Sequence, residues 1–251
     1  MERKNLHSLK KQNIFKNINV HIFNKMAFRN YYCHDTPKTK RVWNDRYIQI
    51  LSVDPARLNF ALRVEKRYIS GKKKGIVEPV LFWKKDFTKN TFVSIIEELE
   101  KDSEVYLETH VFLVEKQMKK TEMLLIMQHV LTYFIVKTRN YPLCPDVIQM
   151  SAKIKGDVLG YNSQLFEGNK KLKKWSSSLS RQLCEKRNDS FSIKVMDYWL
   201  SKEHPKNVRK DDDLADTIVM CEAYYQIKLK KFESPKKEKK QKVRILIKNV
   251  E

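Results

Sequence analysis

The order of short apolar runs and helical patterns between residues 47 and 227 constrains the fold more than any other feature of this chain. Short β-branched runs between turn residues are typical of buried strands, and apolar residues three and four apart are typical of helices. Strands are predicted at 47–53, 59–65, 77–83, 105–114 and 146–151. Helices are predicted at 91–101, 119–137, 170–187, 191–201 and from about 212 to 229. This order predicts an α/β fold, with a mixed five-stranded sheet and helices on both faces.

Two segments of this pattern carry further predictions. Gly71 and Gly75 bracket three lysines between the second and third predicted strands, which predicts a β-hairpin. The helix at 119–137 has apolar residues around most of its circumference, so it should be buried on more than one side. We therefore expect one face of this helix to pack on the sheet and another to form a two-fold interface between two copies of the chain.

The charge balance excludes an ordinary neutral metabolic enzyme as the default interpretation. The chain has 51 Lys and Arg against 30 Asp and Glu, a formal charge of +21. Such an excess indicates a polyanionic partner, with nucleic acid as the first candidate and a membrane surface as the second. No run of about 18 apolar residues is present, so we expect no membrane-spanning segment, and no signal peptide is evident. The four cysteines form no CxxC pair, which argues against a zinc finger and fits a reducing compartment.

The basic residues concentrate at the two ends of the chain. Residues 1–46 hold eleven Lys and Arg against three acidic residues, and residues 228–251 hold ten against three. We therefore predict a basic N-terminal extension, a central domain over 47–227 and a basic C-terminal tail. The extension is interpreted either as a mitochondrial presequence or as a plain basic arm, with Met26 as an alternative start. The tail includes a short predicted strand at 243–247, and it is either a solvated segment or an arm that contacts phosphates.

Acidic residues stand at the ends of three predicted elements of this basic chain. Asp54 ends the first strand, Glu115 follows the apolar residues 111–114, and four aspartates open the last helix, namely Asp211, Asp212, Asp213 and Asp216. Taken singly, an aspartate after a strand is a turn residue, and acids at a helix start are caps. If the three ends converge, their like charges are costly unless a cation holds them, and hard oxygen ligands select Mg²⁺ or Mn²⁺. Two such ions about 4 Å apart promote phosphodiester hydrolysis, so the joint pattern indicates a nuclease.

Helical geometry separates the four aspartates of the last helix. A helix turns about 100° per residue, so Asp213 and Asp216, three positions apart, share a face. Asp212 lies four positions before Asp216 and is the uncertain member of the set. Asp211 lies about 140° round the helix from Asp216, so we interpret it as a cap or a first-turn acid.

Three segments of the chain form an ordered set of motifs, which are SVDPARLNFA at 52–61, LVEKQ at 113–117 and KDDDLADTIV at 210–219. Together they resemble the three motifs of the RuvC-type Holliday-junction resolvases. The resemblance is nearest to the resolvases of poxviruses and other large DNA viruses, and the fungal mitochondrial resolvases are more distant. It implies an RNase H-like fold, a homodimer, and paired nicks across a four-way DNA junction. It also implies dependence on Mg²⁺, with two ions per active site and with Mn²⁺ as a substitute.

The resemblance implies roles for individual residues. The catalytic and metal-binding carboxylates are expected to be Asp54, Glu115, Asp213 and Asp216. Three residues are expected to support these ligands from outside, namely Asp212, Gln117 and Asn59. DNA contacts are expected from Lys116, Met118, Lys153 and Lys155. Of these, Lys153 matches a basic residue that approaches the scissile phosphate.

Two positions depart from the family's pattern. Ala56 stands where the family commonly has glycine, so the backbone is not expected to take a positive φ there. Met118 stands where the bacterial enzymes place an aromatic wedge, which leaves open how the junction is opened.

The sequence therefore predicts a metal-dependent, structure-selective endodeoxyribonuclease that resolves four-way DNA junctions. Two alternatives remain at this point. One is another RNase H-like nuclease, acting on RNA–DNA hybrids or as an exonuclease, and the other is a non-enzymatic basic DNA-binding protein. We expect the protein to act inside the cell at DNA, as a viral protein in an infected host cell or, as the lesser alternative, in a mitochondrion.

Overall fold

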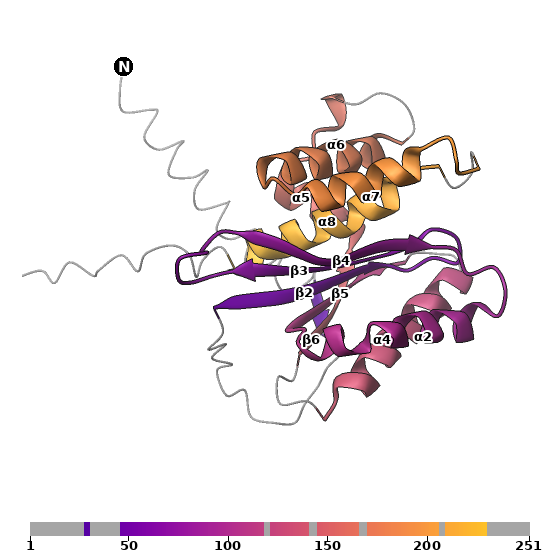
Figure 1. Ribbon diagram of the computed structural model, residues 1–251. Helices are drawn as coiled ribbons and strands as arrows, with labels where there is room; N and C mark the ends of the chain where they lie inside the picture. Colours follow the sequence, from indigo (N-terminus) through magenta and orange to yellow (C-terminus); the bar gives the residue numbers. More distant parts are fainter. Residues whose placement is uncertain are drawn as a thin grey trace, which may run out of the picture.

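A computed structural model describes residues 28–30, 46–117, 121–140, 145–165, 170–205 and 209–229 of the chain. Its centre is one six-stranded sheet in the order β1-β6-β5-β2-β3-β4. The strands are β1 (Phe28–Asn30), β2 (Tyr47–Asp54), β3 (Phe60–Tyr68), β4 (Val77–Lys85), β5 (Val111–Lys116) and β6 (Asp146–Ser151). Helices cover both faces of the sheet, so the described chain forms three layers (Figure 1).

The strand directions are those of the RNase H-like fold that the resemblance implies. Strands β2, β3 and β4 form an antiparallel meander, and β5 and β6 run parallel to β2. The predicted mixed five-stranded sheet is therefore confirmed. The sheet has one strand more than predicted, because the short β1 pairs antiparallel with β6 at the edge. This strand comes from the segment that the sequence assigned to the N-terminal extension.

The hairpin between β3 and β4 forms as predicted. Gly71 and Gly75 have φ angles of 75° and 85°, in the left-handed region that favours glycine. Strand β4 is the sheet edge, and this position tolerates Pro79, which cannot donate to the ladder. The register with β3 shifts between Val64 and Glu65, opposite this proline.

The helices divide between the two faces of the sheet (Figure 1). Helices α2 (Thr91–Lys101) and α4 (Thr121–Thr138) lie on one face, and α5 (Ala152–Leu159), α6 (Lys171–Lys186), α7 (Ser190–Leu200) and α8 (Asp212–Tyr224) lie on the other. A five-residue helix, α3 (Ser103–Leu107), connects α2 toward β5, a single 3-10 turn covers Ser163–Leu165, and a π-helical turn over Tyr225–Leu229 continues α8. None of the described helices is long and apolar enough to cross a membrane.

One predicted strand has the wrong boundary, and one helix of the structure was not predicted. The strand predicted over 105–114 begins only at Val111, and its first part belongs to helix α3. In that helix Tyr106 is fully buried and contacts Phe134 edge to face, with ring centroids 5.7 Å apart. Short apolar runs cannot distinguish strand from helix, which explains this error. Helix α5 was not predicted at all, although it begins directly where β6 ends.

Helix α4 has two apolar faces, as the sequence predicted. One face packs on the sheet through fully buried residues that include Ile126, Val130 and Phe134. Elsewhere on the helix, Leu125 and Val136 are 52% and 53% exposed. The described chain therefore buries one face of this helix and leaves apolar side chains of the other in contact with solvent.

Candidate active site

Three elements bring their acidic residues to one edge of the sheet. Strands β2 and β5 are parallel neighbours, and Val53 pairs with Val114. The next residue of each strand is the predicted carboxylate, so Asp54 and Glu115 lie side by side. Helix α8 packs against β2 and presents Asp216 to the same place.

The three carboxylates form one compact cluster. One oxygen each from Asp54, Glu115 and Asp216 lies within 4.8 Å of the others. Two uncharged side chains fix the outer members, because Gln117 Nε2 donates to Asp54 Oδ1 over 3.2 Å and Ser176 Oγ donates to Asp216 Oδ1 over 2.7 Å. Asp54 and Glu115 are 7% and 6% exposed, so their charges are poorly solvated.

A buried lysine from α5 lies between two of these carboxylates. Lys155 Nζ is 2.8 Å from Glu115 Oε1 and 2.9 Å from Asp216 Oδ1, and the residue is only 1% exposed. Burial lowers the pKa of Lys155, but the charges of Asp216 and Glu115 outweigh this effect and leave the pKa above its usual value. The cluster therefore contains a permanent ammonium ion.

The carboxylates differ in their affinity for protons. Burial first, and then the charges of Glu115, Asp213 and Asp216, raise the pKa of Asp54 well above its usual value. Burial also raises the pKa of Glu115, but the Lys155 charge and a hydrogen bond from Asp54 outweigh it and leave that pKa below normal. The pKa of Asp216 is raised by burial despite the opposing charge of Lys155. A proton is thus held preferentially on the Asp54 side of the cluster.

Removal of the ammonium ion should make the fold depend on a divalent cation. Breaking a buried ion pair costs about 3–5 kcal/mol, so we expect Lys155→Met to lower the Tm of the metal-free protein by about 10 °C. Saturating Mg²⁺ should restore more of the Tm in this variant than in the wild type, because the added cation compensates Glu115 and Asp216. Thermal melts in chelator and in Mg²⁺ test this.

The exposed Lys153, two residues earlier on α5, gives the matched control. Lys153→Met should melt as the wild type does under both conditions. A response of Lys155→Met to Mg²⁺ no larger than that of the wild type would contradict the expectation.

The other predicted carboxylate, Asp213, lies outside the three-residue cluster. Lys210 Nζ is 3.0 Å from its Oδ2, and burial and the neighbouring Asp212 raise the pKa of Asp213. Its charge still reaches the cluster, since it contributes to the raised pKa of Asp54. Asp212 pairs with Lys173 from α6 and lies 3.7 Å from Lys210 Nζ.

Asp211 lies at the start of α8 and outside the carboxylate cluster, as predicted, but its side chain does not cap the helix. Asp211 occupies the N-cap position of α8, but its side chain makes no capping hydrogen bond. The carboxylate instead accepts a hydrogen bond from Ser177 Oγ over 2.9 Å and lies 3.6 Å from Arg181 Nε. Both partners belong to α6, so the side chain of Asp211 connects the start of α8 to α6.

The remaining predicted residues lie in different settings. Asn59 adopts a left-handed φ of 63° and accepts a hydrogen bond from Lys84 Nζ over 3.1 Å, without a described contact to the carboxylates. Lys116 and Lys153 are exposed, whereas Lys155 is buried in the acidic cluster, and the DNA contacts of all three stay a prediction. Ala56 is not among the described residues with positive φ, as expected. Met118 lies outside the described residues.

Several partners of the cluster could not be predicted from the sequence. Ser176 reaches Asp216 from a helix 40 positions away along the chain. Lys173 pairs with Asp212 and Lys210 pairs with Asp213, but nothing in the sequence distinguishes these lysines from other basic residues. Only the packing of α6 and α8, which contact each other extensively, brings these groups together.

The donor set suits a small divalent cation. Three carboxyl oxygens converge within 4.8 Å, and burial, followed by the charges of neighbouring groups, leaves the pKa values of Asp54 and Asp216 raised. Hard oxygen ligands of this kind select Mg²⁺ or Mn²⁺. The topology and this cluster define an α/β protein of RNase H-like architecture with a candidate cation site at the end of its central strands.

The comparisons with known proteins find similarity at the level of structure. No protein-family model and no curated protein matches the chain. The fowlpox virus resolvase in complex with substrate Holliday-junction DNA is similar with a TM-score of 0.44 and 19% identity, over 70% of this chain and 97% of that chain. RuvC of Thermus thermophilus is similar with a TM-score of 0.41 and 14% identity, over 72% of this chain and 96% of that chain.

Proposed function

We propose that this protein is a metal-dependent, structure-selective endodeoxyribonuclease that cleaves four-way DNA junctions. The observation that carries the proposal is the convergence of Asp54, Glu115 and Asp216 at one end of an RNase H-like sheet. A chain with a net charge of +21 that only bound DNA would gain nothing from buried carboxylates beside phosphates. The junction as substrate rests on the resemblance of the three motifs to those of the resolvases.

The carboxylates would hold Mg²⁺, with Mn²⁺ as a substitute. When bound, the metal supplies activation of the attacking water and stabilisation of the leaving oxygen of the phosphodiester. Asp54, Glu115 and Asp216 would ligate it, while Gln117 and Ser176 hold two of these carboxylates in place. Two ions per site would also require Asp213. Its carboxylate would leave Lys210 and bind the second metal ion instead.

Lys155 has a second role in this proposal. Its ammonium ion fixes the positions of Glu115 and Asp216 before DNA arrives. The same positive charge would lie beside the scissile phosphate and reduce the repulsion between the carboxylates and the DNA backbone. The exposed Lys116 and Lys153 would then contact neighbouring phosphates.

Cleavage of a mobile four-way junction with and without Mg²⁺, with products mapped on all four strands, tests the proposed function. We expect paired nicks on opposed strands that require the metal, with linear duplex and RNA–DNA hybrid cut far more slowly. Glu115→Gln should be inactive, and Glu104→Gln, an exposed substitution on α3, should be fully active. Preferential cleavage of the hybrid would favour the alternative nuclease, and metal-independent binding without cleavage would favour the non-enzymatic alternative.

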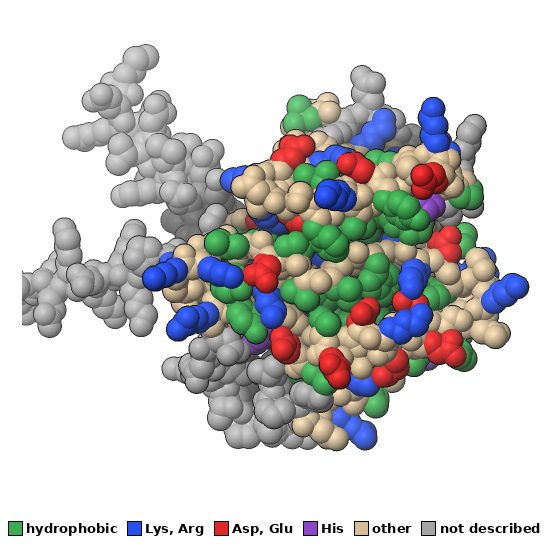
Figure 2. All heavy atoms as spheres, in the orientation of Figure 1, with side chains coloured by type: hydrophobic (Ala, Val, Ile, Leu, Met, Phe, Trp, Pro, Cys, Tyr) green, Lys and Arg blue, Asp and Glu red, His purple; other side chains and the backbone are tan. Residues whose placement is uncertain are grey.

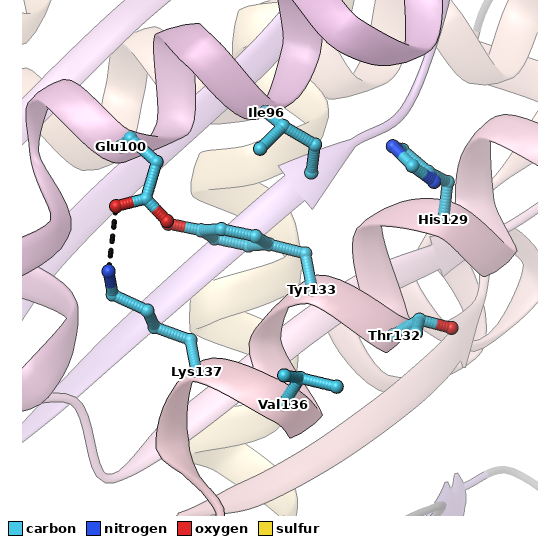
Figure 3. Close-up of a pocket in the computed structure, with 7 residues that line it drawn as sticks. All are labelled: Ile96, Glu100, His129, Thr132, Tyr133, Val136 and Lys137. Atoms are coloured by element: carbon cyan, nitrogen blue, oxygen red, sulfur yellow. Dashed lines mark hydrogen bonds and ion pairs between the residues drawn. The ribbon is translucent and has the colours of Figure 1, made fainter.

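We also propose that the protein acts as a homodimer, with α2 and α4 at the interface. A groove of about 270 Å³ runs between these helices and is lined by Ile96, Tyr133 and Val136, among others (Figure 3). The ion pair of Glu100 with Lys137, 2.7 Å long, flanks the groove. A second copy that covers this apolar face would place two active sites against the two opposed strands of a junction.

Substitution of the exposed apolar face should separate the dimer. We expect Leu125→Glu together with Val136→Glu to give a monomer at micromolar concentration, because two charges would have to be buried in the interface. Light scattering measures the mass. The control is Leu165→Glu, which changes a 75% exposed leucine elsewhere on the chain and should remain dimeric. A wild-type monomer that cleaves junctions fully would contradict this prediction.

The proposed site of action is DNA inside the cell. A viral protein in an infected host cell is the first alternative for its origin and a mitochondrial protein the second. Most of the basic tail and of the N-terminal extension lies outside the described residues, so contacts of residues 228–251 with phosphates rest on charge alone.

A further inference from the structure

A second charged cluster lies on the face of β3 that helices α6, α7 and α8 cover. It consists of three arginines and three acidic residues, namely Arg63, Glu65, Arg67, Arg187, Asp189 and Glu222. Glu65 joins two of the arginines, at 2.7 Å from Arg63 Nε and 2.6 Å from Arg67 Nε. Glu222 on α8 then joins Arg67 and Arg187. The six formal charges cancel.

The charges of this cluster cancel, but two of its hydrogen-bond donors lack acceptors among the described residues. Arg67 Nη2 and Arg187 Nη1 are buried and have no hydrogen-bond partner among the described residues. Arg67 is 98% buried, since only 2% of it is exposed. A buried donor without an acceptor costs about 1–3 kcal/mol, so two such donors call for an acceptor. Burial first, and then the charge of Arg67, lower the pKa of Arg187.

Both arginines line a cavity of about 410 Å³, and Glu222, the carboxylate that pairs with both of them, also lies on its wall. This volume far exceeds the share of one water molecule, which is about 30 Å³, so the cavity has room for a tetrahedral oxyanion with several waters. The cavity lies between the β3–β4 hairpin and the ends of α6 and α8. Both arginines border this space, and because their unpartnered Nη atoms are buried, an acceptor in the cavity would bind them only after a small shift of these side chains.

The cavity lies far from the carboxylates. Asp54 pairs with Ala61 at one end of β3, whereas Arg67 and Tyr68 stand at its other end. Six residues of strand separate Ala61 from Arg67, a distance of about 20 Å. The two sites thus lie at opposite ends of the same strand.

The surroundings of the cavity are basic. Lys186 lies on its wall and is exposed, and residues 72–74 of the adjoining hairpin are three exposed lysines. Lys and Arg side chains gather at this hairpin end of the molecule in Figure 2. An anion that approaches the cavity therefore meets an attractive field before it reaches the guanidinium groups.

We propose that this cavity is a phosphate-binding site, in which Arg67 and Arg187 hold the phosphate oxygens and Lys186 attracts the anion at the entrance. Arginine suits this role because its planar guanidinium presents paired donors to phosphate. The phosphate belongs either to the backbone of bound DNA or to a free phosphate or nucleotide. The site does not depend on the proposed cleavage, because no residue of it belongs to the carboxylate cluster.

Inorganic phosphate tests the site directly on the full chain. At matched ionic strength, millimolar phosphate should raise the Tm of the wild type by about 2–4 °C over chloride. Arg187→Gln should lose this rise, and Lys186→Gln should weaken the apparent affinity for phosphate about threefold. Lys194→Gln, an exposed lysine on α7 outside the cavity, is the matched control and should respond as the wild type does.

If Arg187→Gln does not fold, Lys186→Gln still tests the site, because Lys186 is exposed and its substitution should not disturb folding. Equal stabilisation of the wild type, Lys186→Gln and Lys194→Gln by phosphate would overturn the proposal. So would the absence of any rise over chloride in the wild type. Neither outcome involves cleavage, so this test fails or succeeds separately from the proposed nuclease activity.

Junction binding in chelator then identifies the source of the phosphate. If the occupant is a backbone phosphate, Lys186→Gln should weaken junction binding about threefold and reduce the slope of log affinity against log salt by about one, while Lys194→Gln does neither. If the occupant is a free phosphate or nucleotide, inorganic phosphate binding should fall in Lys186→Gln while junction binding stays unchanged.

Discussion

Asp54→Asn is expected to lose junction cleavage by a factor of about 10³ or more and, at the same time, to raise the Tm of the metal-free protein. The loss follows because Asp54 supplies one of the three carboxylates of the described cluster. A metal held there would contribute several kcal/mol to transition-state stabilisation. The gain in stability follows because the side chain is buried beside other acidic groups. Asn keeps an oxygen that can accept the Gln117 hydrogen bond.

The pH dependence of this gain has a definite sign. Burial and the neighbouring carboxylates raise the pKa of Asp54 in the folded protein above its value in the unfolded chain. A carboxyl of this kind contributes most to stability below its unfolded pKa, and the contribution is lost as the pH rises toward the folded pKa. The difference in Tm between Asp54→Asn and the wild type should therefore grow from pH 4 to pH 8.

Thermal melts in chelator over this pH range measure the effect, and Asp157→Asn provides the control. Asp157 is an exposed residue of α5, so its substitution should leave both Tm and cleavage unchanged. Addition of Mg²⁺ should stabilise the wild type and stabilise Asp54→Asn much less, because one ligand is missing. An Asp54→Asn protein that cleaves normally, or that melts as the wild type does at every pH, would remove Asp54 from the proposed site.

The sequence predicted the carboxylates of the site because their signal is local. Asp54 and Glu115 each end a short apolar run, and the central strands of a sheet are short apolar runs of this kind. Parallel pairing of β2 with β5 then places these strand ends together. The apolar positions between Ile218 and Tyr224 correctly predicted a helix that begins near Asp212.

The partners of the carboxylates could not be predicted in the same way. Lys155 reaches Glu115 only because α5 begins directly after β6, and the pattern of that segment did not reveal a helix. Whether Asp213 faces the cluster or Lys210 depends on ion pairs formed after the elements pack. The short β1 has three residues, too few for any periodicity to identify.

The aspartates of α8 should differ sharply in the effect of their removal. Asp216→Asn is expected to lose cleavage by about 10³-fold or more, because Asp216 is a member of the cluster and also holds Lys155. Asp213→Asn should lose nearly all cleavage as well, since a second ion requires this carboxylate. Asp211→Asn should keep cleavage within about threefold of the wild type, because its side chain contacts Ser177 and Arg181 instead of the cluster.

Calorimetric titration with Mn²⁺ separates the two essential aspartates. If Asp213 ligates only the second ion, Asp213→Asn should still bind one ion per chain, whereas Asp216→Asn should bind neither with measurable affinity. All three variants should bind junction DNA, since removal of a carboxylate lowers the repulsion against phosphates. If Asp213→Asn still cleaves and still binds two ions per chain, Asp213 is not a ligand and the site consists of the three clustered carboxylates. An inactive Asp211→Asn beside an active Asp213→Asn would show that the helix presents a different face to the metal, and the assignment of the site would be wrong with it.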